Sequence, residues 1–87
     1  MNIQKLQLLK TTYAQALAES VAAFPSLYCF DIADVPKVAE KMGAAFERGS
    51  YNKDGRAVKL MCKRLGISHT YSGINNFLEG SLPLLES

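Results

Sequence analysis

Apolar side chains recur at spacings of three and four over residues 3–24, which is the spacing of one face of an α-helix. Five alanines between positions 14 and 23 add high helix propensity. Pro25 ends the pattern, because the residue before a proline is disfavoured in helical conformation. We therefore expect a first helix over residues 3–24. Its apolar stripe consists of Leu6, Leu9, Tyr13, Leu17, Val21 and Phe24.

A second helix is expected to begin near Asp34 and to end at Gly49. Asp34 is placed to cap its free amides, and Pro36 stands in the first turn, where a missing amide proton matters little. Gly43 is unfavourable in mid-helix, so it indicates a close crossing with another helix. The apolar positions of this segment are Val35, Val38, Met42, Ala45 and Phe46.

A third helix is expected from about residue 54 to residue 65, after a polar turn at residues 50–55. Gly66 suits the left-handed residue that follows many helices, and Ile67 suits the apolar residue that packs back after such a cap. The inward positions of this helix are Ala57, Val58, Met61, Cys62 and Leu65.

A fourth helix is expected over Tyr71–Glu79, with Ser68 or Thr70 as its cap and Gly80 at its end. Its apolar positions are Tyr71, Ile74, Phe77 and Leu78.

Residues 26–33 contain one short apolar run, which fits a strand, a helical turn or an extended connector. One strand cannot make a sheet, so a buried connector is the preferred interpretation. The chain of 87 residues has the length of a single domain. We therefore expect one all-α domain, a small bundle of about four helices with a helix-turn-helix-like pair in its C-terminal half.

Positive charge is concentrated in the second half of the chain. Residues 48–78 carry six cationic side chains against one acid, Asp54, for a net charge of +5, whereas the remainder has a net charge of −3. On a helix, Arg56, Lys59 and Lys63 project together because residues three and four apart are neighbours. Such a face is either simply solvated or contacts phosphates, in which case binding weakens steeply with salt.

Residues 57–78 also contain the features of a helix-turn-helix. Gly66 stands at the turn, where a positive φ suits glycine, and Ile67 follows as the apolar plug between the helices. The inner faces consist of Met61, Cys62 and Leu65 in the first helix and Ile74, Phe77 and Leu78 in the second. Two capped helices of an ordinary bundle are the alternative interpretation of this pattern.

This stretch resembles the helix-turn-helix of phage repressors and Cro-like proteins over about a quarter of the chain, although its second helix begins later after the glycine than in that family. The segment KRLGISHTYSGINNFL is also similar in style to small accessory proteins carried by phages and plasmids. The resemblance implies binding to DNA, with the second helix facing the bases.

The first functional hypothesis is therefore a nucleic-acid-binding or transcription-associated protein whose partner is DNA or RNA. Cations and hydroxyls suit phosphates, and asparagine suits adenine in the major groove. The candidate contacts are Arg56, Lys59, Lys63, Arg64, Ser68, Thr70, Ser72, Asn75 and Asn76.

The alternative hypothesis is a protein-interaction module, such as a phage-type modulator of a host protein, and a homodimer is compatible with both. Tyrosine is favoured at interfaces because its ring is rigid and amphipathic. The candidate interface residues are Tyr51, Leu82, Leu84 and Leu85.

The sequence contains no residue pattern that indicates catalysis. Cys29 and Cys62 have no metal-ligand spacing and are interpreted as free core thiols, and His69 has no nucleophile or orienting partner in its pattern. We therefore expect a non-enzyme without metal or cofactor. No apolar run approaches the roughly 20 residues of a membrane span, and no signal peptide is recognised, so a cytoplasmic location without membrane contact is expected.

Overall fold

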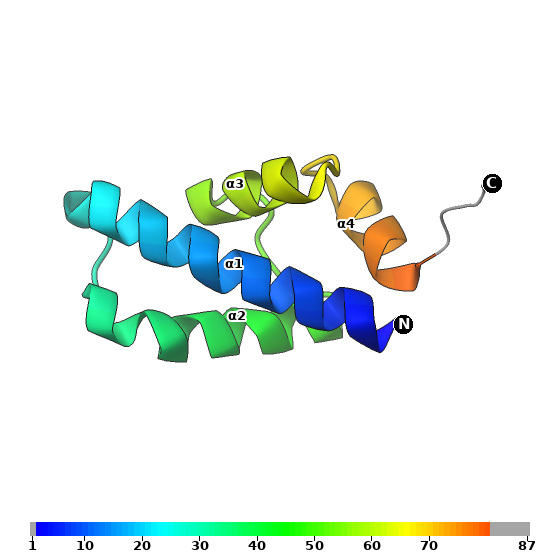
Figure 1. Cartoon of the computed structure of the whole chain (residues 1–87), viewed down its shortest axis with the longest axis horizontal. Helices are drawn as coiled ribbons and strands as arrows, with labels where there is room; N and C mark the ends of the chain where they lie inside the picture. The colour runs from blue at the N-terminus through cyan, green and yellow to red at the C-terminus, as the bar shows by residue number, and fades with distance from the viewer. Residues whose placement is uncertain (1, 81–87) are drawn as a thin grey trace.

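The computed structural model describes residues 2–80, which form four α-helices and no strand (Figure 1). The helices are α1 (Ile3–Ala23), α2 (Val35–Arg48), α3 (Arg56–Leu65) and α4 (Tyr71–Glu79). This arrangement confirms the prediction of a small all-α bundle. The described part is elongated, with principal extents of 43 × 20 × 18 Å.

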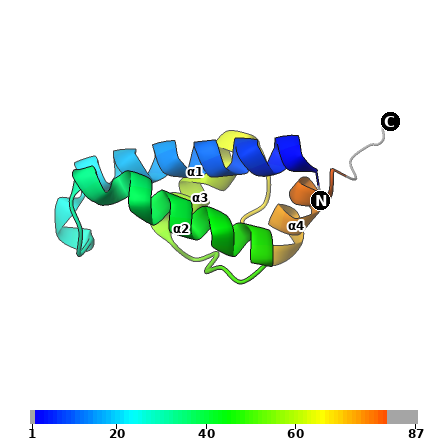
Figure 2. The same cartoon turned by 90° about the horizontal axis from the view of Figure 1, so that it is seen from below.

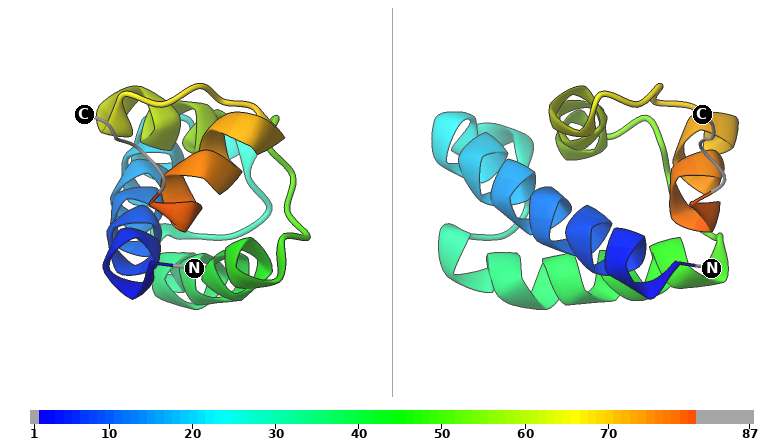
Figure 3. Two further views of the ribbon diagram at one scale, coloured as in Figure 1. Left: turned by 90° about the vertical axis from the view of Figure 1, so that its right-hand side faces the viewer. Right: turned by 45° about the vertical axis from the view of Figure 1, so that its right-hand side comes forward.

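The long helix α1 is the element against which the other three helices pack. α2 returns alongside it in the opposite direction, and α3 lies against another side of α1 (Figures 1 and 2). α4 covers the N-terminal end of α1 (Figure 3), where the Asn2 amide donates to the Leu78 carbonyl at 2.9 Å.

The helix-turn-helix pair is not confirmed by this arrangement. In that motif the two helices pack against each other, so that the second is held out toward the groove. Here α3 and α4 each pack mainly on α1.

The inward stripe of α1 follows the predicted pattern up to its last member. Leu6, Leu9, Tyr13, Leu17 and Val21 are buried in the common core. The helix ends at Ala23, however, and the Phe24 backbone leaves helical geometry with φ −134° and ψ 63°. Its side chain is 46% exposed, so the prediction that Phe24 packs inward was wrong.

The crossing of α1 and α2 is close at Gly43, as its position in mid-helix predicted. Gly43 is buried, and a Cβ built on it would lie 3.1 Å from Cγ of Lys10 on α1.

Asp34 does not cap α2 through its side chain. Instead its carboxylate accepts the Asp31 amide at 3.3 Å across a short 3-10 turn, so that prediction was wrong.

The connector between α1 and α2 differs from the expected buried segment. It contains two 3-10 turns, Pro25–Leu27 and Ile32–Asp34, and its apolar side chains face largely outward. Leu27 is 58% exposed, and Tyr28 and Phe30 are only partly buried. With Cys29 exposed as well, that thiol is not the core residue that was expected, whereas Cys62 on α3 is buried as predicted.

The ends of α3 and α4 follow the predicted capping chemistry. Gly66 takes the left-handed conformation with φ 69°, and the Ile67 amide donates to the Cys62 carbonyl at 3.0 Å. At the start of α4 the hydroxyl oxygen of Thr70, rather than that of Ser68, accepts the Gly73 amide at 2.9 Å.

Two glycines within helices, Gly43 and Gly73, are expected to respond differently to alanine. A Cβ on Gly73 would lie 2.4 Å from the Ser68 backbone carbonyl oxygen, so the backbone must shift. We expect Gly73→Ala to lower the free energy of unfolding by about 1–3 kcal/mol. At Gly43 the neighbour is the flexible stem of Lys10, so the gain in helix propensity, about 1 kcal/mol, offsets the contact. Urea unfolding followed by circular dichroism measures both; equal losses would contradict this account.

The two thiols are expected to differ in reactivity. Cys29 is exposed, whereas burial both shields Cys62 and raises the pKa of its thiol. Ellman's reagent should therefore titrate Cys29 rapidly in the folded protein and both cysteines in denaturant. Cys29→Ser should remove the rapid phase; a rapid phase that survives this substitution would show that Cys62 is accessible.

Candidate nucleic-acid interface

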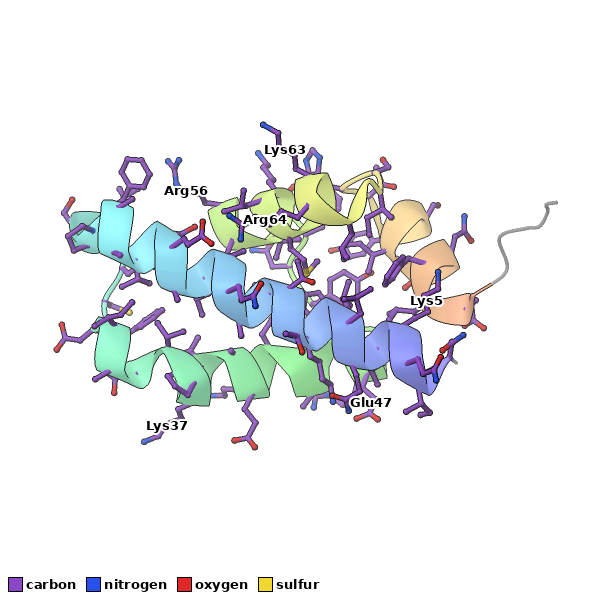
Figure 4. The ribbon with its side chains drawn as sticks, in the orientation of Figure 1. Lys5, Lys37, Glu47, Arg56, Lys63 and Arg64 are labelled. Carbon is purple, nitrogen blue, oxygen red and sulfur yellow. The ribbon has the colours of Figure 1, made fainter. Side chains whose placement is uncertain are left out.

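The outward face of α3 is cationic because its other face is buried. Ala57, Val58, Met61 and Cys62 face the core, which leaves Arg56, Lys59 and Lys63 exposed on the opposite side. Figure 4 shows Arg56 and Lys63 leaving α3 on the side away from α2. Within residues 2–80 the ion pairs are Lys53–Asp54 and Glu19–Arg64, so none of these three cations forms an ion pair there, although Lys59 lies close enough to Asp54 to help lower the pKa of that carboxyl.

Arg64 is separated from this face by its partner on α1. Its guanidinium donates to the Glu19 carboxylate, and the contact raises the pKa of Arg64 and lowers that of Glu19. Arg48 lies in the last turn of α2 and not on α3. The cationic stretch seen in the sequence is therefore divided among the end of α2, the loop before α3 and α3 itself.

The loop before α3 adds one cation and one acid to the surface. Lys53 Nζ lies 3.0 Å from Oδ1 of Asp54, and this contact is the main cause that lowers the pKa of the Asp54 carboxyl. Lys53 Nζ also lies 5.6 Å from the centre of the Tyr71 ring. Asp54, Arg56 and Lys59 together line an open hollow of about 470 Å³.

An exposed aromatic ring stands at the other end of the cationic face. Cζ of Arg56 lies 4.6 Å from the centre of the Phe24 ring, where the guanidinium interacts with the π face. This contact joins the end of α1 to the first turn of α3, and the ring remains about half exposed. We call the surface formed by Phe24, Arg56, Lys59, Lys63, Asp54, Lys53 and Tyr71 the cationic strip.

The polar candidates around α4 have different surroundings. Thr70 caps the helix, and its hydroxyl lies 3.4 Å from that of Ser68. Asn75 accepts a hydrogen bond from the Tyr51 hydroxyl at 3.2 Å. Ser72 and Asn76 are exposed on the outward side of α4.

Tyr51 is a core residue, so the expectation that it forms an exposed interface was wrong. Its side chain is 7% exposed, its ring centre lies 4.9 Å from that of Phe46, and burial is the main cause that raises its pKa. Its backbone carbonyl accepts the Tyr71 hydroxyl at 3.2 Å. The other expected interface residues, Leu82, Leu84 and Leu85, lie outside the described residues.

Sequence reasoning missed three contributors to this surface. Phe24 was assigned to the core, although its position directly before Pro25 indicates where the helix and its stripe end. Lys53 was counted in the charge but not placed near Tyr71. Glu19 was missed as the partner of Arg64, since no local pattern connects residues 45 positions apart.

Over residues 2–80, no cluster of three or more metal-binding side chains occurs, and no helix is both long and apolar enough to cross a lipid bilayer. A scan against models of known protein families found no match, and neither curated proteins nor solved structures gave a significant match. The function is therefore argued from the residues of the surface itself.

The Glu19–Arg64 pair is expected to make part of the stability depend on pH. A carboxyl whose pKa is lowered by folding stabilises the folded state above its ordinary pKa, about 4.3, and loses this contribution as pH falls through the lowered value. The stability difference between the wild type and Glu19→Gln should therefore shrink on acidification. The urea unfolding midpoints of the two proteins at neutral and acidic pH measure this difference. Glu40→Gln, an exposed site on α2, is the control; a difference that grows in acid would contradict the pairing.

Proposed function

We propose that this protein binds nucleic acid by contacting the phosphate backbone with the outward face of α3. The observation that supports this most directly is the exposure of Arg56, Lys59 and Lys63 on one side of a helix, none of them in an ion pair within the described residues. Like charges placed together on a surface repel one another, and phosphates relieve that repulsion by displacing small counterions.

The proposal assigns different roles to the candidate residues than a helix-turn-helix does. Arg64 contributes little, because Glu19 already compensates its charge. Asn75 and Thr70 have structural hydrogen bonds, and Glu79 lies on the same outward side of α4 as Ser72 and Asn76. A carboxylate there disfavours phosphates near α4. Contact with the backbone through α3, rather than base reading through α4, is thus the mode that the geometry favours.

The alternative function as a protein-interaction module loses one of its supports. Tyr51 is occupied in the core by contacts with Phe46, Tyr71 and Asn75. An exposed apolar patch does exist at the connector, where Leu27 and Ile32 face outward. The cationic face nevertheless places three side chains of one shared chemistry on one helix, and it determines the proposal.

Binding should show the salt dependence of a surface that contacts about three phosphates. The logarithm of the association constant is expected to fall with the logarithm of salt concentration with a slope of about −2 to −3. This corresponds to a loss of roughly 16- to 64-fold in affinity between about 50 and 200 mM salt. Fluorescence anisotropy with a labelled oligonucleotide measures it.

A charge-matched pair of variants tests whether α3 carries the contacts. Lys59→Gln/Lys63→Gln should reduce the magnitude of the salt slope by about 1.4–1.8, because two phosphate contacts are lost. Lys37→Gln/Lys41→Gln changes the net charge equally on α2, where Lys37 points away from α3 (Figure 4), and should leave the slope unchanged. Absence of binding to any oligonucleotide at low salt, or equal losses in both variants, would refute the proposal.

A further inference from the structure

The cationic strip has an exposed aromatic ring at each end. Of the eight aromatic side chains in the chain, all of which lie within residues 2–80, only Phe24 and Tyr71 are largely exposed, at 46% and 48%. Each has a cation over its ring: Arg56 at 4.6 Å from the Phe24 centre and Lys53 at 5.6 Å from the Tyr71 centre. The two exposed rings are therefore both associated with cations of the same surface.

The two ends are connected through a series of neighbouring charged side chains. Arg56 and Lys59 line one hollow with Asp54, and Asp54 is paired with Lys53. Lys53 in turn lies over Tyr71. A path of charged side chains therefore runs from Phe24, just past the end of α1, through the first turn of α3 and residues 53–54 of the preceding loop to Tyr71 at the start of α4.

The strip combines two features that different nucleic acids use differently. Phosphates of a duplex and of a single strand are both attracted by cations. Exposed aromatic rings, in contrast, stack on base faces, and these faces are free only in a single strand because a duplex stacks its own bases. Stacking on an aromatic side chain changes affinity by roughly 5- to 100-fold per base.

We propose that the cationic strip binds single-stranded nucleic acid, with bases stacked on Phe24 and Tyr71 and phosphates held by Arg56, Lys59 and Lys53. The inference rests on the proposed function and specifies its ligand. The guanidinium of Arg56 covers one face of Phe24 and leaves part of the ring to a base. Asp54 holds Lys53 over Tyr71, which positions this cation beside a second stacking site.

The first test compares probes on the unchanged protein. Anisotropy titrations use a ~12-nucleotide single strand, as DNA and as RNA, a hairpin duplex with the same number of phosphates, and an abasic single strand. The protein should bind the single strand at least about 5-fold more tightly than the duplex or the abasic strand, because only the single strand offers free base faces. DNA and RNA present the same base faces, so tighter binding of either one meets this expectation.

The second test compares variants that keep or remove the rings. Phe24→Leu and Tyr71→Leu should each weaken single-strand binding roughly 5- to 100-fold without changing the salt slope or the affinity for the duplex. Phe24→Tyr and Tyr71→Phe keep the ring and should bind within about twofold of the wild type. Tyr71→Phe also loses the hydrogen bond to the Tyr51 carbonyl, so it controls for that contact. Leu27→Ala removes another exposed apolar side chain of the same region and should have no effect.

The outcomes separate the two proposals. Equal affinity for the duplex, the abasic strand and the single strand, with no effect of the leucine variants, would overturn the single-strand inference and leave backbone binding through α3 intact. Failure of every probe to bind at low salt would overturn both.

Discussion

One face of α1 is the constraint on which the rest of the structure depends. The three other helices bury their apolar positions against it, and they make far less contact with one another. Leu6, Leu9 and Leu17 are almost fully buried there, and burial of each such side chain contributes about 1.5–3 kcal/mol. α1 must therefore fold for any of the other helices to have a packing surface.

The same constraint determines where charge appears. α3 buries Met61 and Cys62 against α1, so its cationic residues have to face solvent on the far side. At the margin of the contact, Arg64 lies close enough to α1 to pair with Glu19. Just after the last turn of α1, Phe24 lies outside the core, and its ring contacts the guanidinium of Arg56. The Arg64–Glu19 ion pair, the contact between Phe24 and Arg56, and the exposure of the cations on α3 are thus three results of one packing arrangement.

Much of the fold is predictable from the sequence because helices and their ends are governed by local chemistry. The spacing of Leu6, Leu9 and Tyr13 identifies the inner face of α1, and Gly66 and Thr70 identify helix boundaries through backbone conformation and capping. The surface is less predictable because it depends on which helices meet. Tyr51 looked exposed in a polar turn but packs on Phe46, and the α3–α4 pair looked like a motif until α1 proved to be the partner of both. The contact between Glu19 and Arg64 is long-range, so no local pattern announces it.

The division of α3 into a buried side and an outward side determines which substitutions this helix tolerates during evolution. Replacements at Lys59 or Lys63 alter what the surface attracts without disturbing the core, whereas replacements at Met61 affect folding itself. Surface charge can thus change on one side of a single ten-residue helix while the packing on the other side is kept. A scaffold of this kind permits the charge of its surface to be altered by a few substitutions that leave the core intact.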